Sequence, residues 1–163
     1  MHEQGYDATS TTAIARAAGV SPATLFNYFP TKSSIIFADD HLWDLRLGPV
    51  TAMSTPRQTL RALVLDRLVQ PGWTLPADDL VTRMRFELVR GEPALVAAQI
   101  THAFSQVPAL ARAVRSAHPE LGDDEALAHA GATVGAVLAA LTWAQDGNLR
   151  AAIEAALDRT QGT

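Results

Sequence analysis

The chain has 163 residues, no cysteine, and 13 basic against 17 acidic residues, for a formal net charge of −4. The absence of cysteine excludes disulfides, thiolate metal ligands and cysteine nucleophiles. Apolar residues make up 48% of the chain, which excludes a disordered protein. No basic region followed by an apolar run begins the sequence, so we expect a cytoplasmic protein. The acidic balance counts against general affinity for nucleic acid.

Two short helices joined by a tight turn are predicted near the start of the chain. Ser10 and Ser21 can each cap a helix N-terminus, because a serine oxygen accepts a free amide of the first turn. Gly19 suits the left-handed residue that often follows a helix. Pro22 fits the first helical position, where its missing amide has no cost. Pro30 ends the second helix.

The second helix has two different sides at about 100° per residue. Leu25, Phe26 and Phe29 form an apolar side that can face the first helix. The opposite side is small and uncharged, and consists of Ala23, Thr24, Asn27 and Tyr28. Such a pair fits a helix-turn-helix, whose second helix enters the DNA major groove. Caps and faces alone fit an ordinary αα-hairpin equally well.

The order of residues around these helices separates the two interpretations. The relevant residues are Gly5 to Ser10, Ile14, Ala15, Ala18 to Ser21, Thr24, Leu25, Tyr28 to Pro30 and Lys32. Together they resemble the DNA-binding domain of TetR-like (TetR/AcrR) transcriptional regulators. The resemblance implies an all-helical, homodimeric repressor that binds palindromic double-stranded operator DNA and responds to a small-molecule ligand.

The resemblance also implies roles for individual residues of the second helix and the turn after it. Ser21, Pro22, Ala23 and Thr24 match the groove-facing positions, Asn27 stands where the family often has histidine, and Tyr28 and Lys32 match the phosphate contacts.

The chain departs from the family pattern at several positions. Phe26 replaces a more usual tyrosine, and Thr12 and Ala13 replace residues that are often charged. Residues 1–4 match only the last turn of the family's first helix, so we expect most of that helix to be missing. Its loss would remove several core side chains, each worth about 1.5–3 kcal/mol. The alternative function is therefore a ligand-binding or dimerisation module that has lost DNA binding.

The rest of the chain is predicted to be helical, which gives an all-α fold. A connecting helix over 33–47 completes a DNA-binding domain at 1–47, and Gly48-Pro49 marks the boundary to a ligand-binding and dimerisation domain at 48–163. Further helices are predicted at 56–69, 77–90, 94–117 (split or kinked by Pro108), 123–146 and 149–159.

The helix from Asp123 to Asp146 is almost uncharged in its centre and long enough to span a membrane. Its alanine and glycine content and its acidic flanks argue against a membrane span. A helix that is apolar on most sides must be covered on most sides. We therefore expect it to form the homodimer interface together with the helix from Leu149 to Arg159, as the resemblance also implies.

Candidates for a ligand pocket lie between the domain boundary and these two helices. They are Trp43, Met84, Phe86, Gln99, His102 and Phe104. Ordinary core packing is the alternative for each of them. The helical half is loosely similar to TetR-like regulators that sense acyl-CoA-type ligands, which implies a small hydrophobic or acyl-type effector.

An enzyme is not predicted. The sequence contains neither a His-Glu-x-x-His motif nor a Gly-x-Ser-x-Gly motif, and the five histidines include no pair at metal-binding helical spacing. We therefore expect no catalytic residues, no metal site and no cofactor.

Overall fold

The computed structural model describes residues 5–37, 50–69, 80–143 and 149–160. These residues form helices without any strand, so the all-α fold class is confirmed. The helices are α1 (Thr11–Ala17), α2 (Pro22–Tyr28), α3 (Lys32–Ile36), α4 (Pro56–Val69), α5 (Leu80–Gly91), α6 (Pro93–Phe104), α7 (Val107–Ala117), α8 (Asp123–Trp143) and α9 (Leu149–Arg159).

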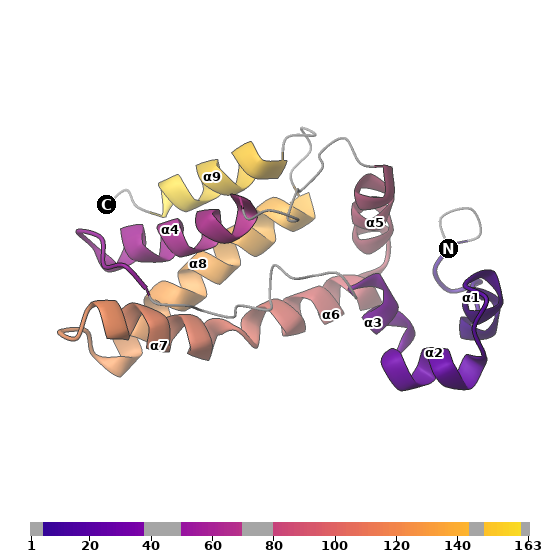
Figure 1. The fold of residues 1–163 in the computed structure, drawn as a ribbon. Helices are drawn as coiled ribbons and strands as arrows, with labels where there is room; N and C mark the ends of the chain where they lie inside the picture. Colours follow the sequence, from indigo (N-terminus) through magenta and orange to yellow (C-terminus); the bar gives the residue numbers. More distant parts are fainter. Residues whose placement is uncertain (1–4, 38–49, 70–79, 144–148, 161–163) are drawn as a thin grey trace.

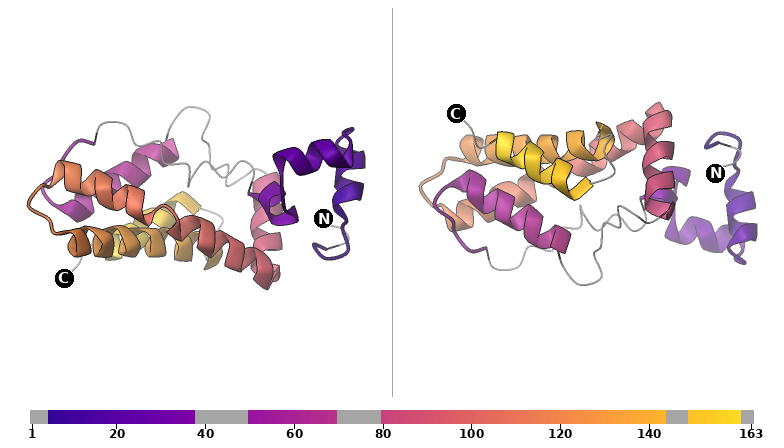
Figure 2. Two further views of the ribbon diagram at one scale, coloured as in Figure 1. Left: turned by 90° about the horizontal axis from the view of Figure 1, so that it is seen from below. Right: turned by 90° about the horizontal axis from the view of Figure 1, so that it is seen from above.

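The helices form a bundle with a small unit at one end. Figures 1 and 2 show α4, α7, α8 and α9 packed along one another, with α5 and α6 extending the bundle and α1 to α3 beyond them. The domain division at residues 47 and 48 falls outside the described residues. The prediction of one continuous connecting helix over 33–47 is wrong at its start, because α3 ends at Ile36 with Phe37 as its C-cap; residues 38–47 fall outside the described residues.

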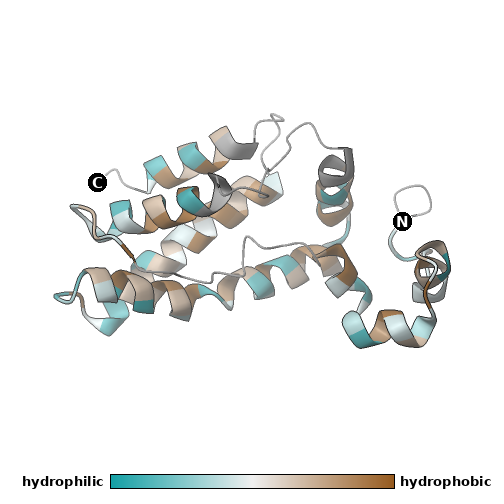
Figure 3. Ribbon diagram, viewed as in Figure 1, coloured by the Kyte–Doolittle hydropathy of each residue, from teal (hydrophilic) through white to brown (hydrophobic). Residues whose placement is uncertain are grey.

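The core of the bundle is built around α8. Its fully or nearly fully buried side chains contact those of α4, α7 and α9, and the cluster contains Leu60, Leu110, Val114, Val134, Ile153 and Leu157 among others. Figure 3 shows few hydrophilic residues along α8, in contrast to α4 and α9. A helix with this composition is stabilised by the neighbours that remove its apolar surface from water.

The helix predicted at 94–117 is broken in the structure. The helix α6 ends at Phe104, α7 begins at Val107, and Pro108 stands in the first turn of α7. Proline is tolerated there because the amide that it lacks would have had no intrahelical partner. The expected split at Pro108 is thus confirmed.

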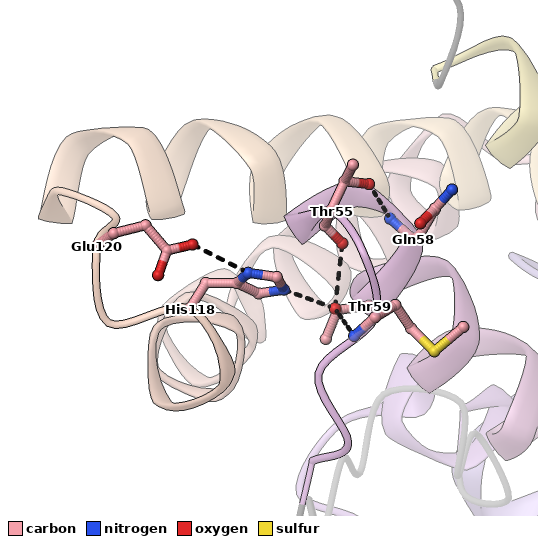
Figure 4. A network of polar contacts seen from close by, with 6 residues as sticks. Thr55, Gln58, Thr59, His118 and Glu120 are labelled. Atoms are coloured by element: carbon pink, nitrogen blue, oxygen red, sulfur yellow. Dashed lines mark hydrogen bonds and ion pairs between the residues drawn. The ribbon is translucent and has the colours of Figure 1, made fainter.

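A buried polar network fastens α4 to the turn between α7 and α8 (Figure 4). The Thr59 hydroxyl lies 2.8 Å from His118 Nε2 and 3.1 Å from the carbonyl oxygen of Thr55, and it accepts a hydrogen bond of 2.9 Å from the Met53 amide. The other ring nitrogen of His118 lies 3.2 Å from Glu120. Thr59 is fully buried and His118 is 6% exposed. Hydrogen bonds satisfy these groups inside the core, as buried polar groups require.

Candidate nucleic-acid interface

The turn between α1 and α2 has the predicted construction. Ser10 Oγ accepts a hydrogen bond of 3.1 Å from the Ala13 amide, and Ser21 Oγ accepts one of 3.0 Å from the Thr24 amide. Both predicted N-caps are therefore confirmed. Gly19 has φ +70°, a conformation that glycine adopts without the penalty a Cβ atom brings. Pro22 opens α2. These local rules fix the two helices on either side of a short turn.

The two helices pack through a narrow strip of side chains. Ala15 of α1 is fully buried, Leu25 of α2 is 8% exposed, and Phe29 is half-buried. Phe26 is 64% exposed, so its predicted place on the buried side of α2 is wrong. The helix α2 has only seven residues, and its contact with α1 covers a strip centred on Leu25. Phe26 projects about 100° further round the helix.

The remaining surface of α2 is open and carries the candidate groove-facing residues. Ser21, Pro22, Ala23, Thr24 and Asn27 are all exposed, and they share this surface with Tyr28, which is 77% exposed. No structural element among the described residues covers them. The surface is uncharged, with small groups at the N-terminal end of the helix and Tyr28 at its C-terminal end.

The hydroxyl groups of Ser21 and Thr24 retain a capacity to bind an external group. Their oxygens lie 2.8 Å apart, so one hydroxyl donates to the other. Two hydroxyls carry two hydrogens, and this contact uses one of them. One hydrogen is therefore available to an acceptor outside the protein. The cap itself orients both groups, because Ser21 also holds the Thr24 amide.

Lys32 differs from the other candidate residues because its ammonium group is engaged within the protein. Its Nζ donates to the carbonyl oxygens of Tyr6 at 2.6 Å and Thr9 at 3.2 Å. It also lies 4.1 Å from the centroid of the Tyr6 ring. Sequence reasoning gave Tyr6 no role, although its place in the Gly5-Tyr6-Asp7 turn was among the matching residues.

Tyr6 lies where the N-terminal unit meets the rest of the molecule. Burial is the largest cause that raises the pKa of its hydroxyl, and the negative charges of Glu92 and Asp7 raise it further, against a hydrogen bond from Ser33. Glu92 stands between α5 and α6. Figures 1 and 2 show α3 beside this corner of the bundle in every view. The unit formed by α1 to α3 therefore meets the bundle at the α5–α6 corner.

The candidate pocket residues lie in different environments. Gln99 of α6 is 3% exposed, Phe86 of α5 is half-buried and packs against the core, and Met84 is half-buried. His102 and Phe104 are exposed. Trp43 lies outside the described residues.

Gln99 is paired with Thr142 of α8. The Thr142 hydroxyl lies 2.8 Å from the carbonyl oxygen of Leu138 and 3.3 Å from Gln99 Oε1. A hydroxyl has a single hydrogen, and the shorter contact uses it. The pair is satisfied when the Gln99 carboxamide is turned over, so that its nitrogen donates to Thr142. Gln99 has no further hydrogen-bond partner among the described residues, although most of its donor and acceptor capacity is unused.

One face of α8 is open to solvent. Ala128, Ala132, Ala139 and Trp143 are exposed along it, and Gly135 has open space where a Cβ atom would stand. We call Ala128, Ala132, Gly135 and Ala139 the small-residue face, and Trp143 stands at its C-terminal end. By length and composition, α8 also passes as a membrane span, but half of its apolar window is buried within the bundle, as in a core helix.

Among the described residues, no group of three or more His, Asp or Glu side chains is placed to hold a metal ion. The side chains on the exposed surface of α2 can form hydrogen bonds and van der Waals contacts.

A comparison with protein families assigns this N-terminal unit. Residues 1–38 match the family described as "Bacterial regulatory proteins, tetR family". Curated proteins give no match to the chain. The matched residues include α1, α2 and α3, together with the whole exposed surface of α2 and the Lys32 contacts.

Proposed function

This chain carries the DNA-binding domain of the tetR family of bacterial regulatory proteins, and from this premise we propose that it is a homodimeric repressor that a small-molecule ligand releases from its operator. DNA-binding regulation of transcription follows from the family match. The observation that carries the proposal further is the exposed, uncharged surface of α2 with its capped N-terminus.

The N-terminal residues of α2 are the proposed base-reading group. Ser21, Pro22, Ala23 and Thr24 stand in the first turn, where a recognition helix meets base edges. The hydrogen bond between the Ser21 and Thr24 hydroxyls leaves one of their two hydrogens free. This hydrogen suits an acceptor on a base or a phosphate. Asn27 lies next along the helix and can pair with adenine through its carboxamide.

Tyr28 is proposed to contact a phosphate from the other end of α2. Its ring is 77% exposed, so the hydroxyl can reach the DNA backbone without a rearrangement of the helix. Contacts to phosphate fix the protein on the duplex but carry no sequence information. We therefore assign Tyr28 to affinity and the first turn of α2 to specificity.

A homodimer is proposed through α8 and α9. The small-residue face of α8 is apolar and exposed in the single chain, and its alanine and glycine residues allow a second helix to approach closely. Two recognition helices about one turn of DNA apart require such a two-fold arrangement, and a palindromic operator mirrors it.

The ligand is proposed to bind within residues 48–163, near Gln99. A largely apolar environment with one buried carboxamide of unused hydrogen-bonding capacity is typical of a site that orients a small ligand. A small hydrophobic or acyl-type effector with one polar group fits this environment. Met84 and Phe86 are the candidates that are partly buried, and they stay predictions together with His102, Phe104 and Trp43.

Release from the operator is proposed to follow from linkage between the two sites. Ligand and operator would prefer different distances between the two α2 helices. A coupling free energy of about 1–3 kcal/mol changes the DNA affinity roughly 5- to 150-fold.

The test is a selection from a pool of random duplexes at low salt with the purified chain. We expect a palindromic motif. Thr24→Ala and Ala23→Ser should change the preferred bases, whereas Tyr28→Phe should weaken binding equally for all sequences. Recovery of no motif would contradict the repressor and would favour a module that binds a ligand or a second copy without DNA.

A further inference from the structure

We propose that Lys32 serves DNA recognition as a positioning residue, by clamping the segment before α1 to the start of α3, rather than as a contact to phosphate. The contacts of Lys32 with Tyr6 and Thr9 are called the Lys32 clamp below. This inference rests on the proposed function, because the position that the clamp sets is that of the DNA-reading helix.

The geometry of the ammonium group carries the argument. A lysine ammonium has three hydrogens and no acceptor. Two of them serve the carbonyl oxygens of Tyr6 and Thr9 at 2.6 Å and 3.2 Å. The third side of the group is occupied by the Tyr6 ring, whose centroid lies 4.1 Å away, within the range of a cation–π interaction. A phosphate oxygen could reach this ammonium group only by displacing one of these partners.

The segment that the clamp holds is itself ordered by short-range contacts. Thr9 is 7% exposed, its hydroxyl donates to the Gly5 carbonyl at 2.8 Å, and its amide donates to the Tyr6 carbonyl at 3.3 Å. Gly5 makes the turn possible with φ +81°. The residue that follows Thr9 is Ser10, the N-cap of α1. The segment therefore continues directly into the first helix of the helix-turn-helix.

The clamp joins the two ends of the helix-turn-helix. Lys32 is the first residue of α3, directly after the turn that ends α2, whereas Tyr6 and Thr9 precede α1. Its two hydrogen bonds span 26 and 23 residues of the chain. The contact between α1 and α2 is narrow, since Ala15 and Leu25 are the buried hydrophobic residues of the two helices. The Lys32 clamp is thus a second connection between the two ends of the unit, and it holds α2 at a fixed angle to α1.

The surroundings of Tyr6 and Lys32 support this view. Tyr6 is half-buried, and desolvation is the largest cause that raises the pKa of its hydroxyl, so neighbouring groups remove part of the side chain from water. Thr31 and Ser34 form a capping box at the start of α3, which fixes the backbone from which Lys32 projects. The side chain therefore leaves a rigid base and ends in a preformed site.

The experiment compares Lys32→Met, Tyr6→Leu and their double variant, with Tyr6→Phe as the matched control. Met keeps the apolar stem of Lys32, and Phe keeps the ring beneath the ammonium group. Binding to a duplex with the selected motif is measured over a range of salt concentrations. We expect Lys32→Met and Tyr6→Leu each to weaken binding roughly tenfold. We expect no further loss in the double variant and wild-type affinity in Tyr6→Phe.

The salt dependence separates the clamp from a phosphate contact. Loss of one phosphate contact lowers the slope of log K against log salt by about 0.9, whereas loss of the clamp leaves that slope unchanged. A lower slope for Lys32→Met, together with unchanged binding by Tyr6→Leu, would overturn the proposal.

A measurement without DNA tests the clamp separately from the proposed function. The ring of Tyr6 should shift the NMR signals of the Lys32 ε-methylene upfield in the full free chain. The shift should disappear in Tyr6→Leu and persist in Tyr6→Phe. Unshifted signals in the wild-type chain would refute the clamp. A wild-type chain that binds no duplex would refute the proposed function, while the ring-current shift still decides whether the clamp exists.

Discussion

The hydroxyl of Thr59 should contribute about 2 kcal/mol to stability through the network around His118. Thr59→Val keeps the size of this fully buried side chain and removes its hydrogen bonds. The Thr55 carbonyl keeps the backbone amide of residue 59 as its partner, and Met53 is 47% exposed, so water can take part in satisfying its amide. His118 has no such replacement at 6% exposure. A buried polar group without a partner costs about 1–3 kcal/mol.

A urea titration followed by far-UV circular dichroism measures this loss, with unchanged dependence on denaturant. In a thermal scan, 2 kcal/mol corresponds to roughly 4–8 °C for a chain of this size. The control is the pair Thr59→Val and His118→Leu, because removal of both partners leaves no orphaned group and should recover part of the loss. A single variant within about 0.5 kcal/mol of wild type, or single effects that simply add, would refute the reasoning.

Three further predictions concern the dimer, the ligand site and pH. Ala139→Glu should leave the fold intact, since surface changes alter stability by less than about 0.5 kcal/mol, but it should convert the proposed dimer to a monomer in analytical sedimentation. The control is Ala94→Glu on the exposed part of α6. A dimer that persists in Ala139→Glu would contradict the proposed interface. Gln99→Leu should raise the thermal midpoint, because it removes a buried carboxamide that is incompletely bonded; a strong destabilisation would mean that the amide is fully satisfied. The pKa of the Tyr6 hydroxyl lies above 10.0 in the folded chain. The folded state therefore keeps its proton longer, and the stability from neutral Tyr6 is full below about pH 10 and lost as pH rises through the folded-state pKa. Glu92→Gln should lower this pKa, measured by tyrosinate absorbance against Tyr6→Phe; an unchanged titration would contradict the proximity of Glu92.

The sequence predicted most helix boundaries because they carry strong local signals. The helices α4 and α9 begin and end at the predicted residues. Pro22, Gly19 and the two serine caps mark the ends of the two helices of the helix-turn-helix. Such signals depend on neighbouring residues alone and can be recognised in one sequence.

Contacts across the chain were not predictable in the same way. A period of 100° placed Phe26 with Leu25, but the width of the buried strip depends on how α2 crosses α1, which no local pattern contains. Residues 59 and 118 meet through the packing of α4 against the α7–α8 turn. The ammonium group of Lys32 meets carbonyl groups more than twenty residues away. Backbone carbonyls exist at every position, so their role as partners leaves no trace in the sequence.

The small-residue face of α8 has an entropic consequence. Alanine and glycine side chains have no rotamers to lose, whereas a long side chain at an interface surrenders up to about 2 kcal/mol of rotamer freedom. Ala128, Ala132, Gly135 and Ala139 can therefore be covered without that cost. They also cannot adapt by changing shape. A helix seated there would meet a surface of fixed shape, so the fit would depend on the shape of the second helix.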